Sequence, residues 1–233
     1  METDFVLFSA RHWGVILAIP LASALLRLAA GRRAERGRTV RLSTGVFLAV
    51  NELVWYGYRL YTEGVRFPEA LPLNLCDLSL WLTVFTLLTL NRWLFDATWF
   101  VGIGGASMAV LTPELWAPFW SYPTMYFFTA HGGVIASLIF LAWSGMARPR
   151  RHAFWRAMLV LHAWAAFVGA FNLIFHTNYM YLCGKPHAPS LLDYMGPWPW
   201  YILTGEAVAV AVFGLLALPF VRRRVEEWSE RCG

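Results

Sequence analysis

The sequence predicts an all-α, polytopic membrane protein in which residues 1–233 form a single seven-helix transmembrane domain. Hydrophobic residues make up 58% of the chain and charged residues 14%, whereas soluble domains have roughly 45–50% and about 25%. A globule of this length cannot bury so much apolar surface. The apolar residues also fall in runs of about twenty, the length that a helix needs to cross a bilayer. Soluble enzymes, disordered chains and secreted disulfide scaffolds are therefore excluded.

Seven apolar stretches are predicted to be the membrane helices. They cover residues 11–30, 42–62, 74–90, 94–112, 124–146, 155–177 and 198–220. The first stretch is preceded by Glu2 and Asp4 and by no basic residue. A secretory signal peptide begins with a positively charged region. We therefore expect the first stretch to be retained as a membrane helix.

The positive charges predict the orientation in the membrane. Lys and Arg gather in the connections after the first, third and fifth stretches and after the seventh, at 32–41, 92, 148–156 and 222–231. The alternate side carries only Arg11, Arg59, Arg66 and Lys185. Short cytoplasmic loops are enriched in Lys and Arg. The pattern predicts an outer N-terminus and a cytoplasmic C-terminus, and it gives no reason to expect a nucleic-acid partner.

Polar side chains within the apolar stretches indicate a function. A charged side chain that faces lipid costs at least about 2.5 kcal/mol, so such residues normally face the protein interior. Given the predicted orientation, nearly all of them lie in the outer half of the membrane, and the inner half has little beyond His162. This distribution predicts one polar chamber that opens toward the outer leaflet. Its residues are Asn51, Glu52, Tyr56, Arg59, Asn74, Cys76, Asp77, His131, Asn172, His176, Asn178 and Glu206.

Cys76 and His131 are the candidate catalytic residues of this chamber. A free thiol has a pKa of about 8.5, and a neighbouring imidazole can take its proton to produce a nucleophilic thiolate. A carboxylate can orient that imidazole, and amide or backbone N–H groups can bind an oxyanion. We expect the supporting and orienting roles to fall on Asp77, Glu52, Asn51, Glu206, Asn172 and His176.

Other interpretations of the same residues stay open. Cys76 can be a small hydrophobic residue of a helix, or it can form a disulfide with Cys183 in an oxidising compartment. A metal site would need His131, His176, Cys76 and a carboxylate, but no two His residues have the spacing of a helical zinc motif. We therefore predict no metal site.

The outer segment from Asn178 to Trp198 is rich in aromatic residues and proline. Aromatic residues at this depth are typical of an interfacial belt. The alternative is a loop that folds back over the chamber. In that case the residues of the cavity or its loop would be Asn74, Asn178, Tyr179, Trp198 and Trp200.

Several motifs resemble those of the YwaF-type bacterial integral membrane proteins, whose eukaryotic relative is the transmembrane protein 164 family. They are Asn-Glu at 51–52, Leu-Pro-Leu-Asn-Leu-Cys-Asp-Leu at 71–78, Gly-Gly-Ala at 104–106, Leu-Thr-Pro-Glu at 111–114, His-Gly at 131–132, Asn-Tyr-Met-Tyr-Leu at 178–182 and Leu-Asp-Tyr-Met-Gly-Pro-Trp-Pro-Trp-Tyr at 192–201. The resemblance extends from the second apolar stretch to the seventh.

The resemblance implies a lipid acyltransferase that works through an acyl-cysteine intermediate, or a related ester hydrolase. Carried over by motif, the nucleophile is Cys76 and the base is His131. Asn74 stands where many bacterial members are expected to carry His, so the resemblance implies no general base there. The eukaryotic substrates cannot be transferred with the resemblance. We expect a membrane phospholipid as substrate and the bacterial cytoplasmic membrane as location. Thioester exchange requires no cofactor, and the sequence contains no cofactor motif.

A transporter or binding protein is the alternative function. In that interpretation Glu52, Arg59, Asp77, His131 and Glu206 would form a substrate or proton path. The gathering of polar residues in one half of the membrane and the absence of an internal repeat favour the enzyme. The sequence identifies neither the acyl donor and acceptor nor the oligomeric state.

Overall fold

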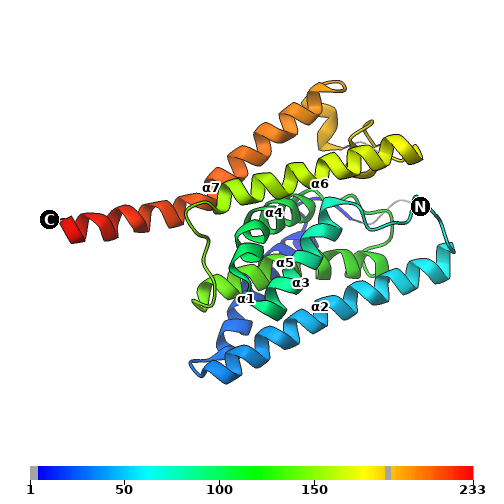
Figure 1. The fold of residues 1–233 in the computed structure, drawn as a ribbon. Coiled ribbons are helices and arrows are strands. Elements are labelled where there is room, and N and C mark those ends of the chain that lie inside the picture. Colours follow the sequence, from blue (N-terminus) through cyan, green and yellow to red (C-terminus); the bar gives the residue numbers. More distant parts are fainter. Residues whose placement is uncertain (1–4, 187–189, 233) are drawn as a thin grey trace.

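The structure is a computed structural model that describes residues 5–186 and 190–232, with side chains described as far as Phe220 (Figure 1). Glu2, Asp4 and the side chains of the predicted basic group at 222–231 lie outside the described residues. The described part contains seven α-helices and no strand, which confirms the predicted all-α fold. The helices are α1 (Ala10–Ala30), α2 (Ala34–Glu63), α3 (Leu75–Thr89), α4 (Arg92–Leu111), α5 (Tyr122–Trp143), α6 (Ala153–Phe175) and α7 (Trp200–Cys232).

Local sequence explains several helix ends. Asn91 precedes α4, and its Oδ1 accepts hydrogen bonds from the backbone N–H groups of Trp93 at 2.8 Å and Leu94 at 3.2 Å. This side chain thereby satisfies donors that have no partner within the helix. Helix α6 ends at His176, whose φ of 55° is left-handed. Two 3₁₀ turns follow, η1 (Tyr179–Tyr181) and η2 (Leu191–Met195), within the outer segment.

Five of the helices in the described part are long and apolar enough to cross a membrane: α1, α4, α5, α6 and the Trp200–Phe220 part of α7. The sequence predicted seven crossings. Helix α3 has 15 residues and is about 22 Å long at 1.5 Å per residue, shorter than the roughly 30 Å of a hydrocarbon core. Helix α2 is long, but charged residues along it, Arg41, Glu52 and Arg59 among them, lower its hydropathy. These two helices complete the bundle beside the five apolar ones.

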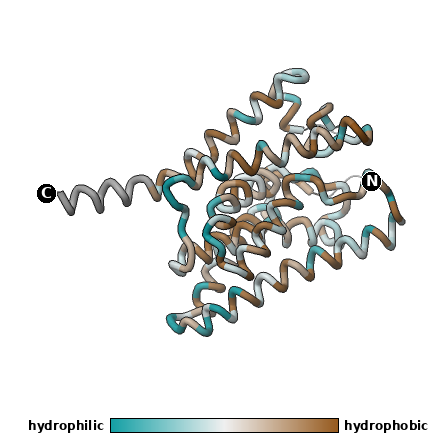
Figure 2. Tube along the Cα trace, viewed as in Figure 1, coloured by the Kyte–Doolittle hydropathy of each residue, from teal (hydrophilic) through white to brown (hydrophobic). Residues whose placement is uncertain are grey.

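Helix α4 is the centre of the bundle. It packs against α3, α5 and α6. In the most apolar part of α4, 67% of the residues are buried, compared with 11% in the corresponding part of α7. Phe95, Phe100 and Val101 of α4 are each 1% exposed. Helices α6 and α7 lie together on one side of the bundle, and α2 lies on the opposite side (Figure 1). Hydrophobic residues run along the outer helices, while hydrophilic residues gather at the α1–α2 and α5–α6 connections (Figure 2).

Close packing of α4 depends on glycine. A Cβ atom at Gly102 would lie 2.9 Å from Leu138 Cδ1 and 3.2 Å from Val134 Cγ1. We expect Gly102→Ala to destabilise the protein by about 1–3 kcal/mol, because overpacking forces buried side chains to shift. Thermal unfolding in detergent measures the effect. The control is Gly214→Ala, where a Cβ would meet no atom within 4 Å. Equal melting temperatures for the two variants would contradict this packing.

A buried ion-pair network holds the end of the bundle where the α5–α6 connection lies. Asp96 of α4 is fully buried. Its Oδ1 accepts a hydrogen bond from the backbone N–H of Arg150 at 3.0 Å, and its Oδ2 accepts one from Arg150 Nε at 2.7 Å. Arg156 of α6 also pairs with Oδ2. The network therefore ties the connection and the start of α6 to the central helix.

Candidate functional site

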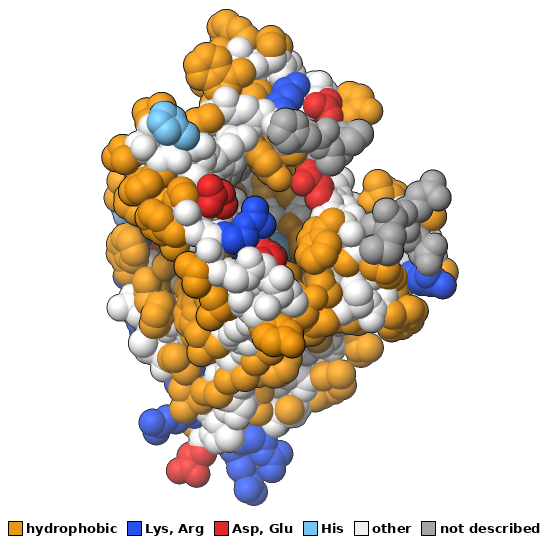
Figure 3. Space-filling model, turned by 90° about the vertical axis from the view of Figure 1, so that its right-hand side faces the viewer, with side chains coloured by type: hydrophobic (Ala, Val, Ile, Leu, Met, Phe, Trp, Pro, Cys, Tyr) orange, Lys and Arg blue, Asp and Glu red, His pale blue; other side chains and the backbone are white. Residues whose placement is uncertain are grey.

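The structure contains a large cavity of about 1200 Å³ at the other end of the bundle. Its rim comes from the α2–α3, α4–α5 and α6–α7 connections, and its depth is lined by apolar residues such as Val101, Val134 and Phe213. Figure 3 shows a hollow on this face with acidic and basic side chains close to it. A cavity with an apolar depth and a polar rim has the character of a small-molecule or lipid site.

Polar residues from five helices line this one cavity. They include Glu52 of α2, Asn74 and Asp77 at the start of α3, His131 of α5, His162 of α6 and Glu206 of α7, together with Cys76. The structure thus brings together residues that are up to 154 positions apart in the sequence, from Glu52 to Glu206. Of the twelve residues that the sequence predicted for one polar chamber, eight line this cavity: Glu52, Tyr56, Arg59, Asn74, Cys76, Asp77, His131 and Glu206.

The shortness of α3 places Cys76 below the rim. Only Leu90 and Asn91 connect α3 to α4, so the adjoining ends of the two helices are level. Helix α3 has 15 residues and α4 has 20. At the cavity end, the start of α3 therefore lies about 7 Å deeper in the bundle than the end of α4. His131 follows the start of α5 by nine residues, about 13 Å along the helix. Both candidate catalytic residues line the cavity.

Cys76 is a free and exposed cysteine of the cavity wall. It is the second residue of α3. The N-terminus of a helix carries partial positive charge and N–H groups without partners in the helix. Cys183 is also free and is not part of the cavity wall. The described residues therefore contain no Cys76–Cys183 disulfide.

His131 has its tautomer fixed by its own helix. Its Nδ1 lies 2.8 Å from the backbone carbonyl oxygen of Phe127. A carbonyl only accepts hydrogen bonds, so Nδ1 carries the proton, and Nε2 of the neutral ring has a free lone pair. The Phe127 ring packs against the imidazole at 4.3 Å between centroids. The Phe127 carbonyl, and none of the carboxylates, thus orients this histidine. No hydrogen bond joins His131 to Cys76 in the described part of the chain.

Glu52 is fully buried and bound on one side only. Its Oε2 accepts a hydrogen bond from Tyr126 Oη at 2.5 Å. Trp55 stacks on the Tyr126 ring with 4.3 Å between centroids and so holds that tyrosine. The other carboxylate oxygen, Oε1, has no hydrogen-bond partner within the described residues. Glu52 interacts electrostatically with both Cys76 and Asp77.

Asp77 and Asn74 shape the start of α3. Asp77 Oδ2 accepts a hydrogen bond from the Asn74 backbone N–H at 3.0 Å, which is half of a capping box. Asn74 Oδ1 accepts one from the backbone N–H of Met180 at 3.2 Å. Both side chains line the cavity. Together they fix the helix turn that carries Cys76 and tie it to the outer segment.

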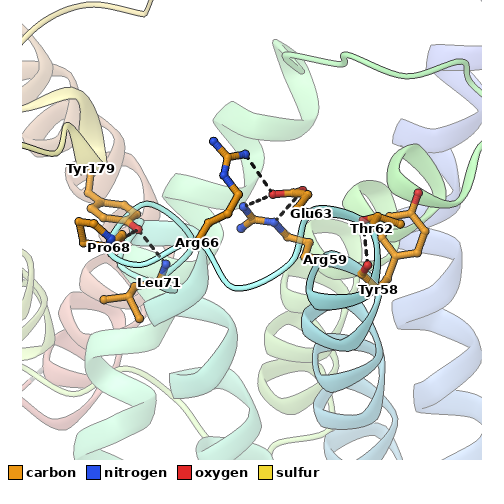
Figure 4. A network of polar contacts seen from close by, with 8 residues as sticks. All are labelled: Tyr58, Arg59, Thr62, Glu63, Arg66, Pro68, Leu71 and Tyr179. Atoms are coloured by element: carbon orange, nitrogen blue, oxygen red, sulfur yellow. Dashed lines mark hydrogen bonds and ion pairs between the residues drawn. The ribbon is translucent and has the colours of Figure 1, made fainter.

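Asn172 and Tyr179 anchor the outer segment over the cavity. Asn172 is 1% exposed; its Nδ2 donates to the Tyr179 carbonyl and its Oδ1 accepts from the Tyr179 backbone N–H. Tyr179 Oη donates to the Pro68 carbonyl at 2.6 Å and accepts from the Leu71 N–H at 2.8 Å (Figure 4). Burial raises the pKa of Tyr179, so its hydroxyl remains protonated. Residues 179–182 and 190–195 line the cavity, as expected for a loop that folds back over it.

Six of the predicted residues lie outside the cavity wall: Asn51, Asn172, His176, Asn178, Trp198 and Trp200. His176 ends α6 and is exposed. Asn178 Oδ1 accepts hydrogen bonds from the Cys183 and Gly184 N–H groups. Trp198 Nε1 donates to the Leu182 carbonyl at 3.1 Å, and Trp198 and Trp200 are 60% and 62% exposed. These positions therefore shape the outer segment or its surface.

Three partner residues were not found by sequence reasoning. Tyr126 holds Glu52, and its signal was weak because tyrosine is common near membrane interfaces. His162 was set aside as an isolated residue, but its Nε2 lies 3.3 Å from Glu206 Oε1 in the cavity wall. Asp96 was not singled out, although a charge inside an apolar helix is a recognisable signal.

The rim carries a second set of charges. Arg59 and Arg66 both pair with Glu63, at 3.0 and 3.5 Å (Figure 4). Lys185 lies 3.9 Å from Asp193. Arg59, Glu69, Glu114 and Asp193 are part of the cavity wall, so both signs of charge face the opening. Within the described residues no group of three or more His, Cys, Asp and Glu side chains is placed to hold a metal ion.

Comparison with known proteins identifies the family. No curated protein and no solved structure matches the chain. The model of the TMEM164 family matches residues 7–217, a range that includes every residue of the cavity wall. Together with the five apolar helices, this match makes the chain a multi-pass membrane protein that belongs to the TMEM164 family.

Proposed function

We propose that this protein is a cysteine-dependent lipid acyltransferase or lipid ester hydrolase. It moves a fatty acyl group from a phospholipid, through an acyl-Cys76 intermediate, to a lysophospholipid or to water. One observation carries the proposal: an exposed thiol at a helix N-terminus shares a cavity with a histidine whose Nε2 lone pair is free. These are the parts that nucleophilic acyl transfer requires.

The first half of the reaction forms the thioester. Nε2 of His131 takes the Cys76 thiol proton, and the thiolate attacks the ester carbonyl carbon. The resulting oxyanion receives hydrogen bonds from the backbone N–H groups at the start of α3. The bond between the acyl carbon and the glycerol oxygen then breaks. His131 returns the proton to that oxygen, so the lysolipid leaves and His131 is neutral again.

The second half releases the acyl group. A hydroxyl of a lysophospholipid, or water, attacks the thioester carbonyl, and the carbon–sulfur bond breaks. The proton of the attacking group ends on the Cys76 sulfur, so the enzyme returns to its starting state. The apolar depth of the cavity accommodates the acyl chain, and the charged rim accommodates the polar headgroup.

We infer the membrane orientation from the arginine distribution. The α1–α2 and α5–α6 connections are arginine-rich and lie at the end of the bundle opposite the cavity rim. By the positive-inside rule this end faces the cytoplasm. In a bacterial cytoplasmic membrane the cavity then opens toward the outer leaflet, and the N-terminus lies outside.

Replacement of His131 tests the proposal. The assay places the purified protein in bilayers that contain a phospholipid with a labelled acyl chain and an unlabelled lysophospholipid. We expect wild type to transfer or release the label and His131→Ala to do so about 10²–10⁴-fold more slowly, the range typical of a lost general base. His176→Ala, an exposed histidine away from the cavity wall, is the matched control. Equal rates for the two variants would contradict the proposed base.

A further inference from the structure

The α4–α7 lobe is the apolar part of the cavity. On α7 its wall includes Ile202, Gly205, Val208, Ala209, Val212 and Phe213. On α4 it includes Gly104, Gly105 and Met108. The α2 and α5 side of the same cavity is more polar, because it carries Glu52, Tyr56, Arg59, Tyr126 and His131. An acyl chain in the cavity is therefore expected on the α4–α7 side, where it removes apolar surface from water.

The lobe begins beside the nucleophile. Cys76 follows Leu75 on α3, and a Cβ atom at Gly105 of α4 would lie 3.8 Å from Leu75 Cδ2. One residue earlier on α4, a Cβ atom at Gly104 would lie 3.1 Å from Phe213 Cε1 of α7. The wall is thus continuous from the first turn of α3, across α4, to α7. An acyl carbonyl at Cys76 can therefore direct its chain into the lobe.

The length of the lobe matches an acyl chain of one membrane leaflet. From Ile202 to Phe213 the α7 wall is about 16 Å long at 1.5 Å per residue. The hydrocarbon core of a bilayer is roughly 30 Å thick, so the chains of one leaflet span roughly 15 Å. The ionisable residue on this stretch, Glu206, has its Oε1 3.3 Å from Nε2 of His162 on α6. Its carboxylate thus has a partner within the protein beside the apolar wall.

Gly205 is the position on α7 where an added side chain would enter the lobe. It lines the cavity, and it precedes Val208 by three residues and Val212 by seven, a spacing that places all three on one helix face. A Cβ atom at Gly205 would meet no atom within 4 Å. A larger side chain there therefore takes up cavity volume without disturbing contacts between helices.

We propose that the α4–α7 lobe binds the acyl chain of the substrate and that Gly205 determines which chain lengths it accepts. This inference rests on the proposed function. The ester carbonyl lies at Cys76, the chain passes Gly105 into the lobe, and the missing side chain at position 205 leaves room for its distal methylenes. Gly205 is thus a specificity-determining residue, and it takes no part in the chemistry.

The test is a competition between two chain lengths. Purified protein is placed in bilayers that contain equal amounts of dilauroyl and distearoyl phospholipid with one headgroup, together with a lysophospholipid. Mass spectrometry of the lipids gives the ratio of lauroyl to stearoyl groups that are transferred or released. Burial of each methylene is worth about fourfold in affinity. We therefore expect Gly205→Phe, whose ring displaces several methylenes, to raise this ratio at least about tenfold over wild type.

Gly214→Phe is the matched control. Position 214 follows Gly205 by two and a half helical turns and so lies on the opposite face of α7. It is outside the cavity wall, and a Cβ atom there would also meet no atom within 4 Å. The ratio should stay within about twofold of wild type. Because the ratio compares two substrates of one protein sample, a lower folded fraction does not change it.

The possible outcomes distinguish this inference from the function on which it rests. If Gly205→Phe leaves no measurable turnover, Gly205→Ala gives the same comparison, with an expected rise of about fourfold for one displaced methylene. An unchanged ratio at position 205, or an equal rise in Gly214→Phe, would overturn the role of the lobe and leave the proposed function intact. A wild-type protein that neither transfers nor releases either chain would overturn both together.

Discussion

Cys76→Ala is expected to abolish lipid acyl transfer. Alanine cannot form a thioester, so no part of the covalent route remains. Cys76→Ser is expected to be inactive or nearly so, because a hydroxyl is far less acidic than a thiol and therefore a weaker nucleophile at neutral pH. The measurement is release or transfer of a labelled acyl chain in bilayers that contain the purified protein.

The matched control for this prediction is Cys183→Ala. Cys183 is the second free, exposed cysteine of the described residues, and it lies outside the cavity wall. Its replacement should leave turnover within about twofold of wild type. A Cys76→Ala protein that still transfers the label would eliminate the nucleophile. A transport function would take its place if Cys76→Ala kept wild-type uptake of a substrate while Glu52→Gln lost it.

Asp96→Ala is expected to have the largest effect on stability. The carboxylate is fully buried and holds Arg150 and Arg156. Removing one partner of a fully buried ion pair costs about 3–5 kcal/mol. The Arg150 and Arg156 side chains are 42% and 29% exposed, so water compensates part of their charge, and we expect a loss of about 3 kcal/mol. Denaturant or thermal unfolding in detergent measures this loss. Arg150→Ala should cost less, since Arg156 still pairs with the carboxylate.

Glu63→Ala provides the contrast for Asp96→Ala. Glu63 also lies between two arginines, Arg59 and Arg66, but its side chain is 27% exposed. Water screens such pairs, so we expect a loss of no more than about 1 kcal/mol. Equal losses in the two variants would show that burial does not control the strength of these networks. A loss below about 1 kcal/mol for Asp96→Ala would contradict the network at the basic end.

Hydropathy and motifs predicted much of the fold. Every predicted stretch corresponds to a helix, because apolar runs of this length have few other stable structures in a membrane. The prediction of seven crossings was less accurate for α2 and α3. Arg41, Glu52 and Arg59 lower the hydropathy of α2. The bounds of α3, Leu75–Thr89, agree with the predicted stretch within one residue, but its 15 residues are too few to cross a bilayer.

The sequence predicted which polar residues gather but not how they pair. One chamber follows from the cost of charge in lipid, and the cavity contains Cys76, Asp77, Glu52, His131 and Glu206. Their partners depend on how each helix is rotated about its own axis. Side-chain packing sets this rotation, and hydropathy does not predict it. A backbone carbonyl orients His131, a tyrosine from α5 holds Glu52, and Glu206 meets His162. Loop residues such as Asn178 and Trp198 bond within the outer segment for the same reason.

Detection of an acyl-Cys76 enzyme tests the proposed covalent mechanism most directly. Detergent-purified protein is incubated with phospholipid, and its intact mass is recorded before and after treatment with neutral hydroxylamine. The account predicts a mass increase of fatty-acyl size that hydroxylamine removes, that is present in Cys183→Ala and that is absent in Cys76→Ala. A wild-type protein that converts phospholipid without any such adduct, or an adduct that persists in Cys76→Ala, would contradict it.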